Sequence, residues 1–345
     1  MGGRRVVKGT ADAVQYKKAV LRQRGANMQY FDREQVEALL PMQDCIALMR
    51  QTLIDYTQKN AVQVLRTAMK VEEGKILGVM PAAYLPLGVA GTKVITVFPG
   101  NFKRGLPSHQ GVVVLFDTET GALRAVVDGE AVTGVRTAAV SAVATDLLAR
   151  KDAEVLAILG AGQQARRHLQ AISMVRPIRE VRVWDIDPAA AARYVAEMQQ
   201  RYGIPVRDCS ADVHSAVKGA DIICTVTAAK QPVLFGADVA PGTHINAVGA
   251  CAAADRELDT ALVQKARLFC DSMQSAKAEA GDYLIPLQQG AIAPGHLLGE
   301  LGAVLSGTLA GRVADNDITI FEALGLAVED LAAANAVAQR AARQA

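Results

Sequence analysis

Gly160 and Gly162 stand in the segment "EVLAILGAGQQARRHLQA", which predicts a buried strand, a tight turn and a helix. The spacing is G-x-G-x-x-A: the first glycine permits the turn, the second lets backbone amides approach a pyrophosphate, and Ala165 lets the helix pack closely on its strand. A second predicted strand, "VRVWDID", ends in Asp185, at the ~20-residue distance expected for a carboxylate that bonds the adenosine ribose. Although glycine turns often serve packing alone, this combination predicts a dinucleotide site.

Asp185 also bears on the type of dinucleotide. Its carboxylate repels a 2′-phosphate, and Asp187 adds to that repulsion, so we expect NAD(H) rather than NADP(H). The alternative is that both acids are surface groups in front of a helix. Arg166 and Arg167 follow the first turn and are expected on a solvated face.

Length and composition limit the class of protein. The 345 residues suffice for two domains with an ample core. The net charge of +2 argues against a nucleic-acid surface, and no run reaches the ~18 apolar residues of a membrane span. The five cysteines are odd in number and far apart: Cys45, Cys209, Cys224, Cys251 and Cys270. They predict free thiols in a reducing cytoplasm, without disulfides or a metal site.

The order of predicted elements indicates an α/β fold. An N-cap at Asp32 and helical spacing predict a helix that Pro41 breaks in two. Runs typical of strands follow, with a hairpin around "TETG", and then a helix of small residues. After Lys151, buried strands alternate with helices, as in βαβ units around a parallel sheet. Residues 317–345 predict an amphipathic helix.

From Met28 onward the chain resembles the ornithine cyclodeaminase and mu-crystallin family. The matching segments are "GTKVITVFPGN", "GLPSHQGVVVLFDTETGALRAVVDGEAVTGVRTAAVSAVAT", "ILGAGQQARRHL", "GELGAVLSG" and "DITIFEALGLAVEDLAAA". The resemblance implies a homodimer, and a Rossmann-like dinucleotide-binding domain inserted in an α+β substrate-binding and dimerisation domain. We expect the inserted domain at residues 144–312 and the outer domain at 28–143 plus 313–345, after a basic extension over residues 1–27.

Three cations carry over from the family's substrate site. Arg66 in "VLRTAMK" matches the arginine that fixes the substrate carboxylate, and Lys93 in "GTKV" matches the active-site lysine. Arg136 in "GVRTAA" matches the arginine at the cofactor-facing end of the small-residue helix. The chemistry agrees, because amino and imino acids share a carboxylate that a guanidinium grips bidentately. Taken singly, each cation could equally belong to a structural ion pair.

Ser108 and His109, in "LPSHQ", match the mu-crystallin-like branch of the family, in which they lie beside the cofactor. His109 is either a proton donor near neutral pH or a neutral imidazole that orients a neighbour. The remaining histidines have no partner at metal spacing and are expected to be structural: His168, His214, His244 and His296. The other residues expected at the cofactor are Gly160, Ala161, Gly162, Gln163, Gln164, Asp185, Ile186, Asp187, Val226, Thr227, Val248 and Gly249.

Cys251 lies in "INAVGACAAADRELD", which predicts a strand, a small-residue turn and a charged helix. In the cyclodeaminase branch this position carries an aspartate followed by Pro-Gly-Lys, and both are missing here. A thiol with an ordinary pKa of ~8.5 is mostly neutral at pH 7 and is a poor base. We therefore expect Cys251 near the nicotinamide as an inert group, not a nucleophile. Ala323, in "FEALG", also departs from the family's usual serine.

Reduction of a preformed imine is the chemistry that remains without that acid. A protonated ketimine already attracts hydride, so the protein needs only to hold it over the nicotinamide and exclude water. The resemblance implies NAD(P)H-dependent reduction of a cyclic α-imino acid, such as Δ1-pyrroline-2-carboxylate or Δ1-piperideine-2-carboxylate, to the L-amino acid in proline metabolism. The alternatives are an amino-acid dehydrogenase or ornithine cyclodeaminase, and a non-catalytic NAD(P)H-dependent binder of small ligands.

Overall fold

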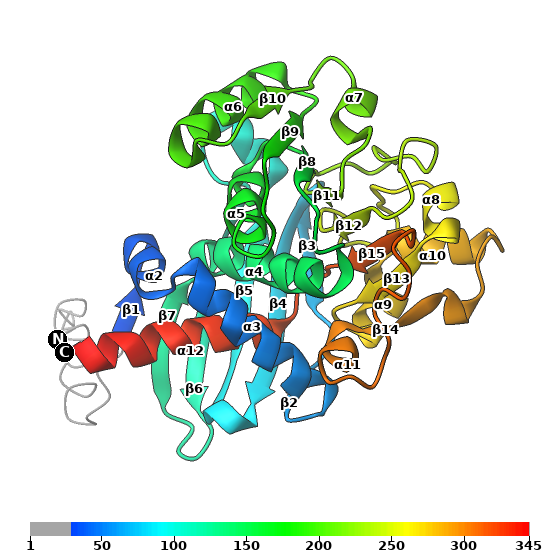
Figure 1. The fold of residues 1–345 in the computed structure, drawn as a ribbon. Coiled ribbons are helices and arrows are strands. Elements are labelled where there is room, and N and C mark those ends of the chain that lie inside the picture. Colours follow the sequence, from blue (N-terminus) through cyan, green and yellow to red (C-terminus); the bar gives the residue numbers. More distant parts are fainter. Residues whose placement is uncertain (1–28, 345) are drawn as a thin grey trace, which may run out of the picture.

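A computed structural model describes residues 29–344, apart from the side chains of residues 102 and 103. The predicted basic extension over residues 1–27 lies outside the described residues. Two sheets organise the chain, one mainly antiparallel and one parallel, with helices packed around and between them (Figure 1). The α/β fold class is confirmed.

The mainly antiparallel sheet has the strand order β1-β7-β6-β5-β4-β2, with β3 paired to β4. Its strands are β1 (Gln29–Phe31), β2 (Ala61–Gln63), β3 (Thr67–Glu72), β4 (Lys75–Tyr84), β5 (Val89–Val97), β6 (His109–Asp117) and β7 (Leu123–Asp128). The predicted hairpin is β6 and β7, which pair antiparallel. One face of this sheet is covered by the long C-terminal helix, coloured red in Figure 1.

The second sheet is entirely parallel and has the order β10-β9-β8-β11-β12-β15-β13-β14. Its strands are β8 (Val155–Leu159), β9 (Glu180–Trp184), β10 (Val206–Asp208), β11 (Ile222–Thr225), β12 (His244–Ala247), β13 (Arg267–Cys270), β14 (Leu297–Glu300) and β15 (Thr319–Glu322). The order turns back between β8 and β11. Ligands bind at such a reversal, outside the carboxyl ends of the strands.

Helices lie on both faces of the parallel sheet and against the antiparallel sheet. The helices that precede the parallel sheet in the chain are α2 (Arg33–Leu39), α3 (Met42–Thr57) and α4 (Gly129–Leu148). The helices that follow are α5 (Gln163–Ile172), α6 (Pro188–Tyr202), α7 (Val213–Val217), α8 (Thr260–Lys265), α9 (Met273–Glu279), α10 (Gly281–Gln288), α11 (Leu301–Leu305) and α12 (Ala327–Gln344). Short 3-10 turns are η1 (Leu85–Leu87), η2 (Pro99–Arg104) and η3 (Pro294–His296). Buried residues of α5 and α6 share a core with α3, α4 and α12, whereas α7 to α10 pack against the other face.

The helix α4 holds the two sheets together. By length and composition alone it is apolar enough to cross a membrane, but 83% of the qualifying stretch is buried inside the protein. It is therefore a core helix, and its small residues allow close packing on both sides. His168 of α5 bonds the Ser141 hydroxyl of α4 at 2.9 Å, and Asn246 of β12 donates to the Thr145 hydroxyl at 3.0 Å.

Local signals at the start of the fold are confirmed. Asp32 accepts a hydrogen bond from the backbone amide of Gln35, whose side chain bonds back to the Asp32 amide, so the two form a capping box on α2. Pro41 separates α2 from α3, as expected.

Two sequence predictions are wrong. The stretch 317–345 is not one helix: residues 319–322 form β15, because an apolar β-branched run is buried between β12 and β13, and Gly325 (φ 80°) ends the extended segment. We expected the inserted domain to span residues 144–312. The parallel sheet includes β15, which lies beyond residue 312, and α4 runs across residue 143. No helix directly follows Cys251 either, since residues 251–259 form an irregular loop before α8.

Candidate active site

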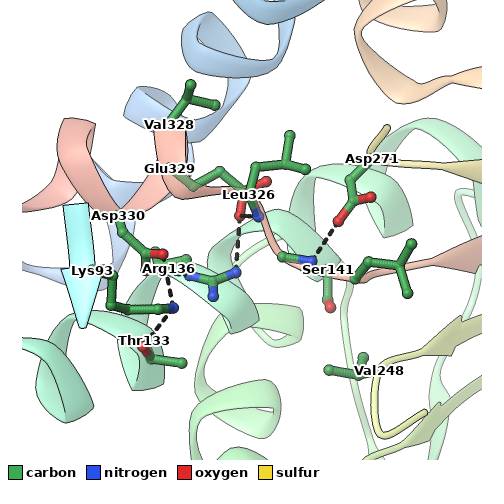
Figure 2. A network of polar contacts seen from close by, with 12 residues as sticks. Lys93, Thr133, Arg136, Ser141, Val248, Asp271, Leu326, Val328, Glu329 and Asp330 are labelled. Carbon is green, nitrogen blue, oxygen red and sulfur yellow. Dashed lines mark hydrogen bonds and ion pairs between the residues drawn. The ribbon is translucent and has the colours of Figure 1, made fainter. Parts of the chain in front are cut away.

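Arg136 lies at the centre of a buried network of charges (Figure 2). It comes from α4, and only 4% of it is exposed. Its Nε donates to Asp330 Oδ1 at 2.9 Å and its Nη1 donates to Glu329 Oε2 at 2.9 Å, so the first turn of α12 supplies both partners. Burial opposes the charged form, but the two carboxylates outweigh it and raise the pKa of Arg136 above its ordinary value.

Lys93 joins the same network from β5. Its Nζ lies 2.7 Å from Asp330 Oδ2 and donates to the Thr133 hydroxyl of α4 at 3.3 Å. Burial lowers the pKa of Lys93 to about 8, and the attraction of Asp330 limits the fall. Lys93 and Arg136, which were predicted as separate matches 43 residues apart, therefore share one carboxylate.

Arg66 reaches the site from the segment between β2 and β3. Its Nη2 donates to the Leu324 carbonyl at 2.6 Å, and its Nε lies 2.9 Å from Glu279 Oε2 of α9. Leu324 precedes Gly325, and a Cβ on Gly325 would lie 2.7 Å from Nη1 of Arg136. Both guanidinium groups therefore contact the short connection between β15 and α12.

This connection, residues 323–326, is the point at which the predicted site residues meet. Asp271, which follows β13, accepts a hydrogen bond from the Gly325 amide at 2.6 Å. Burial raises the pKa of Asp271 to about 6, against the opposing charges of Arg66 and Arg136. The Cys251 thiol lies 3.8 Å from the Leu324 carbonyl that Arg66 also bonds.

The Cys251 thiol is held in its neutral form. Burial raises its pKa to about 11, and although Arg66 opposes this, the buried carboxyl groups around it add to the rise. The sulfur donates weakly to the carbonyls of Val248 and Leu324, at 3.6 and 3.8 Å. Such a thiol is neither a base nor an activated nucleophile at neutral pH.

Ser108 and His109 lie at the beginning of β6. The Ser108 hydroxyl and His109 Nδ1 are 2.9 Å apart. The surrounding protein partly desolvates the His109 ring, and this, together with the charge of Lys93, lowers its pKa. Both effects favour the neutral form of the imidazole.

The glycine-rich turn between β8 and α5 has the geometry that a pyrophosphate needs. Gly160 has φ 103°, and a Cβ there would lie 2.7 Å from the Val226 carbonyl, so only glycine fits. A Cβ on Gly162 would meet no heavy atom within 4 Å, and no side chain caps the first turn of α5. The turn thus leaves space and backbone donors at a helix N-terminus.

Asp185 follows β9 beside this turn. Its two oxygens accept hydrogen bonds from the Ala161 amide at 2.7 Å and from the Asp187 amide at 2.8 Å. Each oxygen keeps a lone pair for a ribose hydroxyl. Asp187 caps α6 through the Ala189 amide at 3.0 Å, and Ile186 is 88% exposed. These residues fit a dinucleotide.

Glu257 is a residue that the sequence did not reveal. Its buried carboxylate accepts hydrogen bonds from the amide and hydroxyl of Thr227, at 2.8 and 2.6 Å, from the Thr225 hydroxyl at 2.7 Å and from the Gly249 amide at 2.7 Å. It thereby ties together the loops after β11 and β12. A Cβ on Gly249 would lie 2.5 Å from this carboxylate.

The dinucleotide turn and the charged network are connected through α4. The Gln164 side chain donates to the Thr133 carbonyl at 3.4 Å, and Thr133 also bonds Lys93. Gln163 bridges Glu130 of α4 and Arg33 of α2. Arg166 bonds the carbonyls of Ala161 and Gly162 and the carboxylate of Glu197. Arg166 therefore contacts the turn, while 29% of its side chain remains exposed to solvent.

Sequence reasoning also missed the acidic partners of the three cations: Asp271, Glu279, Glu329 and Asp330. A signal was available, because a cation in an apolar segment needs a buried counter-charge. The adjacent acids in "GLAVEDLAAA" stand among small apolar residues, where acidic side chains are otherwise unexpected.

The parallel sheet and its glycine turn, with three cations at the carboxyl edge of the sheet, are features of a dinucleotide-binding protein. Residues 27–345 match the family model described as the ornithine cyclodeaminase/mu-crystallin family. This chain belongs to that family.

Known relatives extend this comparison. The chain is 43% identical over 277 residues to the ketimine reductase mu-crystallin of Mus musculus, covering 80% of this chain and 84% of the mouse protein. The structure of Thermococcus litoralis Δ1-pyrroline-2-carboxylate reductase with NADH and L-proline is similar at TM-score 0.89 and 35% identity, covering 92% of this chain and 98% of that one. An archaeal alanine dehydrogenase dimer with bound NAD is similar at TM-score 0.86 and 32% identity, covering 92% and 97%.

The first prediction concerns Gly325. Replacing it with alanine should cost about 1 kcal/mol for its positive φ and about 2–4 kcal/mol more, because the new Cβ displaces the buried Arg136 guanidinium. Gly290→Ala is the matched control, since Gly290 also has positive φ (67°) but an open surrounding. Urea unfolding measures both losses of free energy. Equal losses would show that Gly325 does not position Arg136.

Proposed function

We propose that this protein reduces a cyclic α-imino acid to the corresponding L-amino acid with NADH as the hydride source. The observation that carries the proposal is the convergence at residues 323–326, where two carboxylate-binding arginines and a neutral thiol meet. This connection follows β15, so it lies at the same edge of the parallel sheet as the dinucleotide turn.

The cofactor would be held by residues at the carboxyl ends of the strands. The amides of the Gly160–Gly162 turn would receive the pyrophosphate, and Asp185 would bond the adenosine ribose. The loops that Glu257 ties together would flank the nicotinamide half. When bound, the reduced nicotinamide supplies the hydride.

The protein's own groups would bind and orient the imino acid. Nη2 of Arg136 and Nη1 of Arg66 have no hydrogen-bond partner within the described part of the chain, and both are available to a substrate carboxylate. Lys93 would add a third positive charge. Gripping the carboxylate from two directions fixes which face of the C=N bond is presented.

Cys251 and His109 would act as neutral groups. A carboxylate at position 251 would pair with the cationic imine and lower its reactivity, whereas a thiol does not. We assign to His109 the orienting role of a neutral imidazole, since its lowered pKa disfavours a charged proton donor.

We also infer a homodimer in the cytoplasm. Large apolar side chains remain exposed on the sheet whose other face α12 covers, as expected for a surface that packs against a second subunit. They are Tyr30, Val62, Met69 and Phe116. All five cysteines are free thiols, as in proteins of reducing compartments. The archaeal relative with 32% identity is a dimer.

The second prediction tests the reaction. With NADH, Δ1-pyrroline-2-carboxylate or Δ1-piperideine-2-carboxylate should give kcat/KM at least ~10-fold above pyruvate with ammonia, because position 251 carries a thiol and no acid that would help an open-chain imine form. Turnover is followed by the loss of NADH absorbance. Replacing Arg66 with alanine should lower kcat/KM by an amount equivalent to about 2–5 kcal/mol of transition-state stabilisation, because the substrate carboxylate loses a charged partner. Turnover only in the presence of ammonia would indicate an amino-acid dehydrogenase. No turnover with any of these substrates would indicate a non-catalytic binder.

The third prediction concerns cofactor choice. NADH should support kcat/KM at least ~10-fold higher than NADPH, because Asp185 repels a 2′-phosphate. Asp185→Ser should narrow the ratio, mostly through the KM for NADPH. Equal use of both cofactors by the unaltered protein would contradict the assignment.

The fourth prediction concerns Cys251. Cys251→Ser should keep most of the reductase activity, because no proton transfer or covalent step depends on the sulfur. Cys251→Asp should slow reduction, since its carboxylate would stabilise the cationic imine before hydride transfer. Steady-state kinetics with a cyclic imine measure both. A loss of more than ~100-fold in kcat for Cys251→Ser, with unchanged NADH binding, would make the thiol a catalytic group.

A further inference from the structure

The two cations and two acids that are ion-paired with one another at Arg136 balance before any substrate enters. Lys93 and Arg136 carry two positive charges, and Glu329 and Asp330 can carry two negative ones. Both carboxylate side chains are fully buried. A substrate carboxylate that binds to Arg136 would be a third negative charge in the same buried volume, and an unbalanced charge there is costly.

Of the two acids that are ion-paired with Arg136, Glu329 is the one whose surroundings better allow it to take up a proton. Its Oε2 accepts from Arg136 and from the Leu326 amide at 3.2 Å, whereas its Oε1 is buried without a hydrogen-bond partner in residues 29–344. Asp330, by contrast, contacts both Lys93 and Arg136. An unpartnered buried oxygen is where a proton costs least.

The groups that act on Glu329 come from several elements. The positive group is Arg136 from α4. Negative or titratable groups are Asp330 on the same turn, Asp271 after β13 and Cys45 of α3, and Lys93 acts through Asp330. Burial raises the pKa of Glu329 to about 7, with Arg136 opposing and Asp271 adding to the rise. A further negative charge nearby would raise it more.

We propose that Glu329 takes up one proton when a substrate carboxylate binds, and that this releases the full charge of Arg136 to the substrate. Glu329 is thus a positioning residue that acts through Arg136. The inference rests on the proposed function, because it requires that the site bind a carboxylate. Proton uptake by Glu329 would also bring a proton into the site, and reduction of an imine requires one proton in addition to the hydride.

The direction of the pH dependence follows from this linkage. Below the pKa of Glu329 in the free protein, the residue already holds its proton, so carboxylate affinity is high and independent of pH. Above that pKa, each bound carboxylate draws a proton, and the Kd rises by up to ~10-fold per pH unit.

The fifth prediction tests this with pyrrole-2-carboxylate, a planar carboxylate whose ring nitrogen is not basic and takes no proton. Calorimetric titration of the full chain with NADH, in buffers of different ionisation enthalpy, counts the protons taken up. We expect about 0.5 proton at pH 7, where Lys93 still holds its own proton, and fewer at pH 6, where Glu329 is already protonated. Glu329→Gln should abolish this uptake and make the Kd nearly independent of pH between pH 6 and pH 7.

Asp271→Asn is the matched control, because it removes the other raised acid that faces Glu329, and it should keep the uptake. An infrared difference spectrum gives a second readout: the carbonyl band of a protonated carboxyl group should appear with ligand in the unaltered protein and in Asp271→Asn. Should Glu329→Gln fail to fold, the presence or absence of this band in the other two proteins tests the proposal. Uptake that persists in Glu329→Gln, or is lost in Asp271→Asn, overturns the proposal. Binding without any uptake also overturns it, whereas no binding at any pH refutes the proposed carboxylate site itself.

Discussion

The burial of the Arg136 guanidinium is the constraint on which the rest of the site depends. A charge that is only 4% exposed inside α4 requires carboxylates at hydrogen-bond distance, and the first turn of α12 supplies them. That contact fixes the start of α12 and hence the connection from β15. This connection contains the Leu324 carbonyl, which accepts a hydrogen bond from Arg66, and the Gly325 amide, which donates one to Asp271. One ion-pair network therefore aligns both sheets with the site.

The parts of the fold that were predictable are those with local signals. A capping aspartate, a proline, a hairpin turn and a glycine-rich strand-to-helix turn each act over a few residues, and each predicted its element correctly. The strand β15 was missed because its place depends on distant partners. β15 pairs with β12 and β13. Periodicity alone does not distinguish a short, buried apolar strand of this kind from part of a helix.

The same division applies to the candidate site. The cations Arg66, Lys93 and Arg136 stand in recognisable motifs, and the structure brings them to one connection. Their acidic partners come from α9, from α12 and from the residue after β13, and no short motif links these segments to the cations. Glu257 shows the limit most clearly, because it joins the ends of two strands from a loop that was predicted to be helical.

The position of β15 has a consequence for the way the chain assembles. β15 is made after β13 and β14, yet it lies between β12 and β13 in the sheet. During vectorial synthesis β12 therefore presents an open edge that β13 would fill wrongly if it docked at once. The native sheet forms only after β15 has been synthesised, and β15 pairs with strands that are distant in sequence. Pairing of this kind favours slow folding after synthesis. Because residues 323–326 follow that strand directly, the site is completed only in this last step of sheet assembly.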